Sequence, residues 1–431
     1  MAVKDTGWRF GDADNQRDMI ISYNIFPRKE VQMANHRNHK VQAVPVALLV
    51  AAVFVFTVGL SQVRGAGKPK PPVPKIYPPL VIDQLNPQIV CKGFGTAYDG
   101  RLIQIKRTEG KYEDTWASNA FSPSGFAIGD ADNDGLKEII APVSVYSGLR
   151  RGKDKLYDWK IVAFEDGSIG APSWETGFFY RNAGRGGPLG IGDVNGDDRS
   201  EIFIYLDTHI EIIQLNWGSG SLSLDILGRG PDYAVVPIWS LGAGDSDNQG
   251  DNEILYSIFD QSGIPRILKY NGLGWAEETN IDPLAVFAID VVKARDADND
   301  SGNELIAGGN NSRLMIWKYD DGYYRTVFLS DVLPGYTQGV DVGDVDESPG
   351  NEIVVGATGF GFYLFKYGQP YPSQVFPLGA EPINGLAVED MDGDAKGEIV
   401  AAMNDLKIFD LQDGILVKSF EFPYASQFRI N

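Results

Sequence analysis

The stretch GDADNDGLKE, residues 129–138, places four acidic side chains within ten positions, with a glycine at 135 where the chain has to turn. Like charges held this close repel one another, so the stretch needs a cation or an arrangement that offsets the charge. Related stretches recur, and the first aspartates of the six copies lie at 130, 193, 245, 296, 344 and 390, at intervals of 46 to 63 residues. Such a period is typical of a repeat architecture.

Each repeat contains four short apolar runs separated by Gly, Asp or Asn turns. The last repeat illustrates the pattern with GLAVED (385–390), EIVAAMN (398–404), LKIFDLQ (406–412) and GILVKSFEF (414–422). Runs of this length and spacing are typical of β-strands. Because a four-stranded sheet cannot bury both of its faces alone, we predict an all-β fold in which such sheets stack around an axis as the blades of a β-propeller.

The two ends of the repeat region predict how the ring closes. The segments QIVCKGFGTAYDG (88–100), RLIQIKRTEG (101–110) and KYEDTWASNAF (111–121) read as the second, third and fourth strands of a blade that has no first strand. The final residues SQFRIN (426–431) have the length of the missing strand. We therefore predict seven blades closed by pairing of the two ends, with six blades as the alternative.

The acidic loops have the chemistry of a site for a hard cation. In the first loop, carboxylates stand at positions 1, 3, 5 and 9 (Asp130, Asp132, Asp134 and Glu138), and the carbonyl of Leu136 at position 7 adds another oxygen. Calcium prefers several oxygen ligands in flexible geometry, and an EF-hand loop begins with the same spacing. No Glu stands at position 12 and no flanking helix is expected, so an EF-hand is excluded.

The repeats resemble the FG-GAP or VCBS repeat family, which includes the propeller of integrin α-subunits, with the signature G-D-x-[DN]-x-D-G-x-x-[DE]-[IL]. The resemblance covers most of residues 80–431 and implies calcium loops on one face of the ring. It also implies the ligands of the second, fourth and sixth loops, where Arg199, Gly302 and Lys396 would bind through their backbone carbonyls. These ligands are Asp193, Asn195, Asp197, Arg199 and Glu201 in the second loop; Asp296, Asp298, Asp300, Gly302 and Glu304 in the fourth; and Asp390, Asp392, Asp394, Lys396 and Glu398 in the sixth.

Two loops depart further from this pattern, and weaker or empty sites are expected there. Gln249 replaces the third carboxylate of one loop, and Ser348 and Pro349 occupy the middle of the other. The alternative for all loops is a self-capped acidic turn in which Asp side chains accept backbone N–H bonds. Open sites of this kind bind calcium at about 10⁻⁴–10⁻³ M, as extracellular modules do. The ligands of the two weaker loops are Asp245, Asp247, Glu253, Asp344, Asp346 and Glu352.

The N-terminal part predicts export. Residues 41–60 are uncharged and long enough to span a bilayer as a helix, so they read as a signal peptide starting at Met33 or as an uncleaved anchor. Residues 1–40 precede this span, and the first 32 of them read as the result of a start codon assigned too early or as a cytoplasmic remnant. Residues 61–79 read as a Pro-rich linker before a propeller at 80–431. We therefore expect a secreted or cell-surface protein, anchored if 41–60 is uncleaved.

Charge and residue content exclude several function classes. The formal net charge of −20 disfavours nucleic acid and anionic lipid as partners. Cys91 is the only cysteine, so an intrachain disulfide is excluded, and a buried apolar role is expected for it. His209 is the only histidine of the repeat region and is expected as an exposed turn residue. No catalytic residue is assigned.

A recognition role follows from the resemblance, because the face opposite the calcium loops binds ligands in integrin propellers. We expect an extracellular protein or glycan as partner, with a calcium-dependent polysaccharide lyase or a structural cell-surface component as alternatives. An N-glycosylation sequon lies at Asn310. The expected ligand-face residues are Arg150, Arg151, Tyr180, Arg181, Arg185 and Tyr336.

Overall fold

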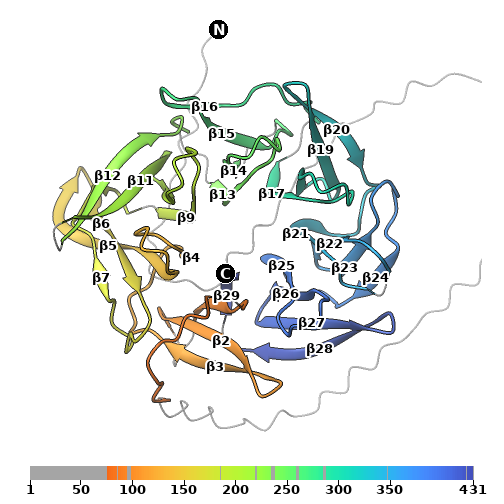
Figure 1. Cartoon of the computed structure of the whole chain (residues 1–431), viewed down its shortest axis with the longest axis horizontal. Coiled ribbons are helices and arrows are strands. Elements are labelled where there is room, and N and C mark those ends of the chain that lie inside the picture. Colours follow the sequence, from red (N-terminus) through yellow and green to blue (C-terminus); the bar gives the residue numbers. More distant parts are fainter. Residues whose placement is uncertain are drawn as a thin grey trace, which may run out of the picture. The chain divides into compact units, whose positions relative to one another are not determined.

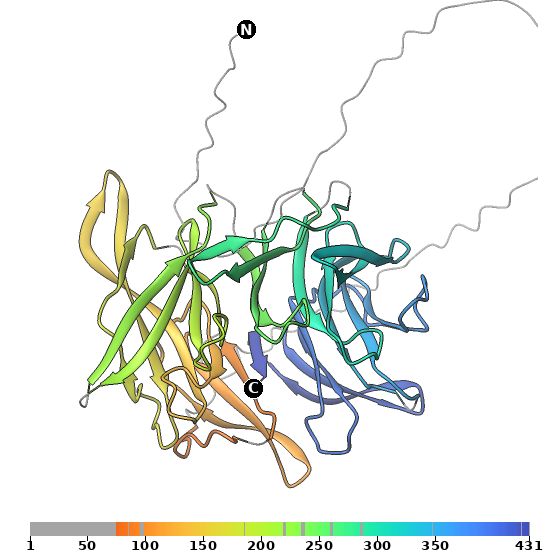
Figure 2. The ribbon, with the colours of Figure 1, turned by 45° about the horizontal axis from the view of Figure 1, so that its top comes forward.

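A computed structural model describes residues 75–430 except 85, 95–98, 185, 219–220, 234–237, 259–261, 285–287, 347 and 424. The described residues form seven antiparallel sheets and no helix. The sheets stand in a ring, with the first strand of each sheet next to the axis (Figures 1 and 2). The protein is therefore a seven-bladed β-propeller, and the six-bladed alternative is wrong.

Blades 1 to 3 come from the N-terminal half of the ring. Blade 1 has the order β29 (Ala425–Ile430), β1 (Ile89–Gly93), β2 (Leu102–Thr108) and β3 (Lys111–Ala117). Blade 2 consists of β4 (Ala127–Gly129), β5 (Glu138–Arg151), β6 (Asp154–Phe164) and β7 (Trp174–Glu175), with β8 (Tyr180–Asn182) also paired to β6. Blade 3 consists of β9 (Gly186–Gly192), β10 (Glu201–Leu206), β11 (His209–Gly218) and β12 (Ser221–Arg229).

Blades 4 to 7 follow the four-strand pattern predicted from the repeats. Blades 4 and 5 consist of β13 (Ile238–Gly244), β14 (Glu253–Ile258), β15 (Arg266–Tyr270), β16 (Trp275–Glu277), β17 (Ile289–Arg295), β18 (Glu304–Gly309), β19 (Leu314–Asp320) and β20 (Tyr323–Leu329). Blades 6 and 7 consist of β21 (Tyr336–Gly343), β22 (Glu352–Thr358), β23 (Gly361–Phe365), β24 (Gln374–Pro377), β25 (Gly385–Glu389), β26 (Glu398–Ala402), β27 (Leu406–Gln412) and β28 (Ile415–Phe422).

The ring closes through blade 1, as the sequence predicts. The C-terminal strand β29 is the inner strand of this blade and pairs antiparallel with β1, with Ile430 opposite Ile89 and Phe428 opposite Cys91. Cys91 is fully buried, and burial raises the pKa of its thiol. The expected apolar role of this cysteine is confirmed.

The hydrophobic core lies between blades rather than within them. Among the residues that the structure describes, seven buried clusters each join two neighbouring blades. For example, Ile140 of β5 packs in one cluster with Ile204 of β10. The cluster between blades 7 and 1 contains Phe428 of β29 together with Ile408 of β27. Since each sheet covers a face of the next, stability belongs to the closed ring.

The described part of the predicted linker lies against the ring. The Lys75 ammonium is 2.7 Å from the Asp114 carboxylate, and the Tyr77 hydroxyl donates to the same carboxylate at 2.5 Å. Contacts with the propeller therefore begin before the boundary at residue 80 expected from the sequence. Within the described residues there is no helix able to cross a bilayer. The predicted span 41–60 and the rest of 1–74 lie outside the described residues.

Candidate metal centre

The six acidic loops occupy the same place in six blades. Each loop joins the inner strand of a blade to its second strand, and the motif glutamate is the first residue of that second strand. Because the inner strands all run in the same direction along the axis, the loops share one face of the ring. The six glutamates are Glu138, Glu201, Glu253, Glu304, Glu352 and Glu398.

Backbone hydrogen bonds shape each loop into a capped turn. In the first loop, the Asp130 carboxylate accepts from the amides of Asp134 and Gly135, both at 3.0 Å. The residue at position 6 is left-handed, with φ of 91° at Gly135 and 61° at Asp198. Ser301 and Ala395 also have positive φ at this position, so the loop keeps its shape where the glycine is replaced. The capped-turn arrangement predicted as an alternative is therefore present.

Capping leaves the carboxylates of the loop close together. In the first loop, one oxygen from each of Asp130, Asp132, Asp134 and Glu138 lies within 4.8 Å of the others. Glu138 is buried, and burial together with the nearby Asp132, Asp130 and Asp134 raises the pKa of its carboxyl to about 9, although a hydrogen bond from the Ala131 amide opposes the shift. The charged form of this cluster is unfavourable without a cation.

Four other loops hold three converging carboxylates each, with the same limit of 4.8 Å between ligand atoms. In the sixth loop, burial and the neighbouring Asp392 raise the pKa of Glu398 to about 8, against a hydrogen bond from the Met391 amide. The sets are Asp245, Asp247 and Glu253; Asp296, Asp298 and Asp300; Asp344, Asp346 and Glu352; and Asp390, Asp392 and Glu398.

The second loop is satisfied by amides instead. Asn195 Nδ2 donates to Glu201 at 3.0 Å, and Gln214 Nε2 donates to Glu201 at 2.9 Å and to Asp197 at 3.2 Å. The Arg199 guanidinium donates to the Gln214 side chain at 3.1 Å and thereby orients it. Neutral donors therefore occupy the space where a cation is expected.

The residue that faces the motif glutamate on the third strand of the blade differs from loop to loop. In blade 5, Leu305 pairs with Trp317, so Lys318 is opposite Glu304. The Lys318 ammonium is 2.6 Å from both Asp298 and Asp300 and 3.0 Å from Glu304. These hydrogen bonds raise the pKa of Lys318, although burial opposes the shift. A tethered ammonium thus stands where the carboxylates of the fourth loop converge.

Blades 4 and 6 have a lysine at the same position. Lys269 faces Glu253, is hydrogen-bonded to Asp247, and is 3.7 Å from Glu253. Lys366 faces Glu352 and is 3.7 Å from it. The third, fourth and fifth loops therefore each contain a cation supplied by their own blade.

Blades 2 and 7 have an acid at this position. Ile139 pairs with Phe164, so Glu165 faces Glu138, and Ile399 pairs with Phe409, so Asp410 faces Glu398. Burial and the nearby Asp132 raise the pKa of Glu165, against a hydrogen bond from Trp174. The first and sixth loops are therefore more acidic than the repeated motif alone.

Two structural details distinguish the acidic loops. A cavity of about 380 Å³ lies beside the first loop, lined by Asp132, Asn133, Asp134 and Arg199. In the sixth loop, the Arg107 guanidinium from blade 1 is 2.7 Å from Asp392. The backbone amides of the residues expected as carbonyl ligands donate hydrogen bonds to the aspartate at position 5 of the loop. In the first loop, the Leu136 amide donates to the Asp134 carboxylate at 2.8 Å.

Asparagines that the sequence analysis did not assign join the loops of neighbouring blades. Asn299 accepts from the Asn351 amide at 2.6 Å, and Asn351 in turn donates to the Asp296 carbonyl at 3.1 Å. In the same way, the Asn303 backbone amide donates to Asn248 Oδ1 at 2.6 Å, and Asn303 Nδ2 donates to the Asp245 carbonyl at 2.8 Å. The recurrence of Asn at positions 4 and 8 of the loops is the signal that reveals this connection.

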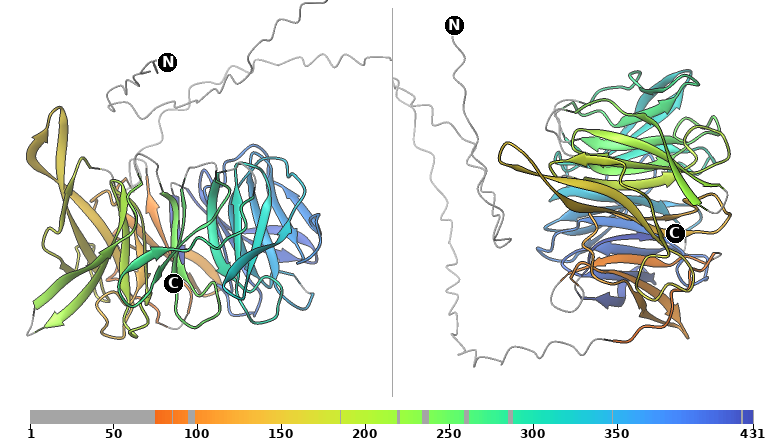
Figure 3. Two further views of the ribbon diagram at one scale, coloured as in Figure 1. Left: turned by 90° about the horizontal axis from the view of Figure 1, so that it is seen from above. Right: turned by 90° about the vertical axis from the view of Figure 1, so that its left-hand side faces the viewer.

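The expected ligand-face residues do not form one cluster. Arg150 and Arg151 lie at the exposed tip of the β5–β6 hairpin, which extends from the ring on the left of Figure 3. Tyr180 and Arg181 lie on β8 of the same sheet, where Arg181 is paired with Asp158. Tyr336 begins β21 in blade 6 and is exposed.

Two further predicted sites have different outcomes. The residue Arg185 lies outside the described residues. Asn310 is exposed in the turn after β18, and its side-chain oxygen accepts from the Ala288 amide at 3.1 Å.

The prediction that His209 is an exposed turn residue is wrong. His209 is the first residue of β11 and is buried. Its Nε2 is 2.7 Å from Glu211, and its ring packs edge-on against Tyr180 with centroids 5.5 Å apart. Tyr180 comes from the neighbouring blade, and contacts across a blade boundary are not visible in the local sequence.

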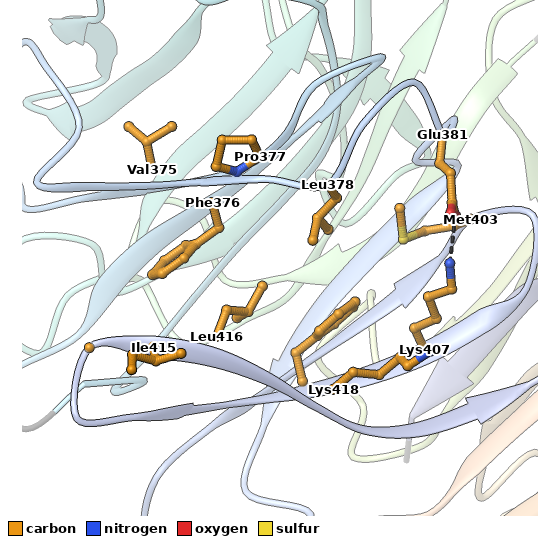
Figure 4. Close-up of a pocket in the computed structure, with 12 residues that line it drawn as sticks. Val375, Phe376, Pro377, Leu378, Glu381, Met403, Lys407, Ile415, Leu416 and Lys418 are labelled. Carbon is orange, nitrogen blue, oxygen red and sulfur yellow. Dashed lines mark hydrogen bonds and ion pairs between the residues drawn. The ribbon is translucent and has the colours of Figure 1, made fainter.

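A larger cavity lies away from the acidic loops. It has a volume of about 630 Å³ and lies between the outer strands of blades 6 and 7, with Phe376, Leu378 and Leu416 in its wall (Figure 4). The Lys407 ammonium bonds Glu381 at 2.6 Å at one end. Its lining is mainly apolar and has no cluster of metal-binding side chains, so it is distinct from the metal centre.

The comparisons with known proteins find structural likenesses only, all at low sequence identity. No family model matches the sequence, and a search of curated proteins finds no match. A solved protein from Lactobacillus plantarum is similar at 12% identity, with 80% of this chain and 100% of that chain covered and a TM-score of 0.49. A putative 6-phosphogluconolactonase from Bacteroides uniformis is similar at 12% identity, with 80% and 99% covered and a TM-score of 0.47. Likenesses at this level concern the fold alone.

Proposed function

We propose that the protein is an exported, calcium-stabilised propeller that recognises an extracellular protein or glycan. The observation that carries the calcium proposal is the residue facing each motif glutamate. A lysine completes the third, fourth and fifth loops, and amides complete the second. Glu165 and Asp410 instead place an acid opposite the motif glutamate of the first and sixth loops. The arginine that contacts Asp392 of the sixth loop, Arg107, comes from the neighbouring blade 1 and not from the blade that carries the loop. We therefore assign calcium to these two loops.

The donor sets suit calcium. Asp130, Asp132, Asp134 and Glu138 would hold the ion in the first loop, and Asp390, Asp392 and Glu398 would hold it in the sixth. Oxygen-only donors in a loop favour calcium over zinc or copper, which prefer nitrogen and sulfur. The bound ion supplies positive charge that removes the repulsion among the carboxylates, and its role is structural.

The recognition role is supported by a surface on the other face of the ring. The β5–β6 hairpin exposes Val145, Tyr146 and Leu149 beside Arg150 and Arg151. Aromatic and arginine side chains are common at the centre of protein interfaces. Export and the resemblance to integrin-type propellers belong to the same proposal, because calcium sites of this affinity are filled outside cells.

Metal analysis after equilibrium dialysis tests the calcium assignment. The intact chain is dialysed against about 5 mM calcium, well above the affinity of open sites, and bound metal is counted per chain. We expect two calcium ions and a melting temperature that falls when a chelator is added. Binding of no ion, or of one at each of the six loops, would contradict the assignment.

A further inference from the structure

The β5–β6 hairpin of blade 2 extends beyond the ring (Figures 2 and 3). Strand β5 has 14 residues and β6 has 11, whereas the second strands of the other six blades have five to seven. The buried part of the hairpin ends at Pro142 on β5 and at Trp159 on β6. Residues 143–158, which we call the arm, lie beyond it. Because the other blades close the ring without such an extension, the arm is available for another role.

One side of the arm is a strand edge without a partner strand. The inner strand β4 pairs with β5 only from Glu138 to Ile140, whereas β17 of blade 5 pairs along the whole of β18. Beyond Ile140, no backbone hydrogen bond joins this edge of β5 to another described residue. Residues 144–146 of the edge are exposed. Such an open edge presents N–H and C=O groups with which a further strand can pair.

The tip of the arm is basic, although the protein is acidic. Residues 147–156 contain four basic side chains and one acid, while the whole chain has a formal net charge of −20. Among the described residues, no ion pair includes any of the four, and the nearby acids Asp158 and Glu175 are paired with other bases. The tip therefore carries positive charge that the described part of the protein does not neutralise. The exposed basic residues are Arg150, Arg151, Lys153 and Lys155.

The two faces of the arm differ in chemistry. Tyr146 pairs with Tyr157 across the hairpin, and Arg150 pairs with Lys155, so these four side chains share one face. The Lys155 ammonium lies 5.8 Å from the centre of the Tyr146 ring, and the two tyrosine rings are 5.9 Å apart. Val145 lies on the opposite face and is 44% exposed. A strand added at the open edge would therefore place its side chains alternately beside the basic face and beside Val145.

We propose that the arm binds an extended acidic segment of a partner protein, which pairs as an additional strand with the open edge of β5 at residues 144–146. Backbone hydrogen bonds to a strand edge supply affinity, and alternate side chains supply specificity. Acidic residues of the segment would contact Arg150 and Lys155, and apolar residues would contact Val145.

The open edge favours a protein over a glycan as the partner. Both kinds of partner can carry the negative charge that the basic tip attracts, but only a polypeptide can continue a β-sheet through its backbone. The inference rests on the proposed recognition role and names the chemistry of the partner.

Fluorescence anisotropy with synthetic peptides and the full chain tests the arm. The probe is a labelled peptide of alternating valine and glutamate, about six residues long to match a typical strand. One comparison peptide has lysine in place of glutamate. A second has a central valine replaced by proline, which keeps the charge but removes a backbone donor. We expect the probe to bind with a Kd of about 10–100 µM and each comparison peptide to bind about tenfold more weakly or not at all.

Charge reversal on the arm should weaken binding of the probe. Arg150→Glu and Lys155→Glu should each raise the Kd about tenfold, and the difference from the wild type should shrink at about 1 M salt, where charges are screened. Lys111→Glu is the matched control, because Lys111 is exposed at the tip of the β2–β3 hairpin and its reversal changes the net charge equally. Each variant is first shown to keep the wild-type melting temperature.

The outcomes separate this inference from the recognition role on which it rests. Equal binding of the proline peptide, or normal binding of the probe by Arg150→Glu, overturns strand addition at the arm. Heparin oligosaccharides serve as an acidic glycan probe. If they bind through Arg150 and the peptide does not bind, the inference fails and the recognition role stands. If neither probe binds, the inference and the part of the arm in recognition both fail.

Discussion

Lys318 and Glu304 face each other across neighbouring strands, with the ammonium 3.0 Å from the carboxylate. The same ammonium is 2.6 Å from both Asp298 and Asp300. The loop therefore contains a cation that is covalently part of its own blade and cannot be removed by a chelator. The repeated acidic loop is thus stabilised in different ways within one ring, by lysine, by amides and, as proposed, by calcium.

Removing this lysine should make the fourth loop dependent on calcium. Lys318→Met leaves three carboxylates without their cation, which we expect to cost about 2–3 kcal/mol in a chelating buffer. Added calcium should restore most of this loss, and the count of bound ions should rise by one. Calorimetric melting with and without calcium measures both effects. Lys418→Met, which breaks the exposed pair with Glu421, serves as a control with little expected change.

The converse substitution should replace calcium in the first loop. Glu165→Lys places an ammonium opposite Glu138, as Lys318 stands opposite Glu304. We expect one bound calcium fewer by isothermal titration, with the melting temperature in chelator raised above that of the wild type. Glu165→Gln should keep the ion, because it removes charge without adding a cation. An unchanged ion count in Glu165→Lys would argue against calcium at this loop.

Asp290 should make stability depend on pH. Its pKa is raised from 3.8 to about 6 by burial, so the folded state holds a proton that the unfolded state releases. The stability that the folded state gains from this proton is complete below about pH 4 and is lost as pH rises through 6. The stability of Asp290→Asn relative to the wild type should therefore be about 1–2 kcal/mol higher at pH 7.5 than at pH 4; the full pKa shift corresponds to about 3 kcal/mol, and solvent screening of the partly exposed carboxyl reduces it. Urea unfolding at the two pH values measures the difference; an equal offset at both would contradict it.

Closure of the ring should depend on one aromatic side chain of β29. Phe428 is buried in the cluster between blades 7 and 1. Phe428→Ala should cost about 3–4 kcal/mol because it leaves a cavity at the seam. Tyr371→Ala, which affects an exposed ring, is the control. Urea unfolding gives the comparison, and a cost below about 1 kcal/mol would mean that the seam does not control stability.

The repeats were sufficient to predict the blades, the closing strand and the acidic loops. The strands follow from short apolar runs between turn residues, and the loops follow from the fixed spacing of acidic residues within the ten-residue motif. The residue facing the motif glutamate was not predictable. It lies 14 positions after Glu304 at Lys318 but 27 positions after Glu138 at Glu165, since the hairpin between the strands varies in length. The partners of His209 likewise depend on strand register and on the neighbouring blade.

The pairing of β29 with β1 also orders events during synthesis. Strand β29 is made after all the other described strands but belongs to the blade that was begun first, so β1 keeps an unpaired edge while blades 2 to 7 emerge. Such an edge is able to pair with other chains. The interval between translation of β1 and translation of β29 is therefore when this edge of the nascent protein is exposed to aggregation, and a chaperone that covers β1 would act there.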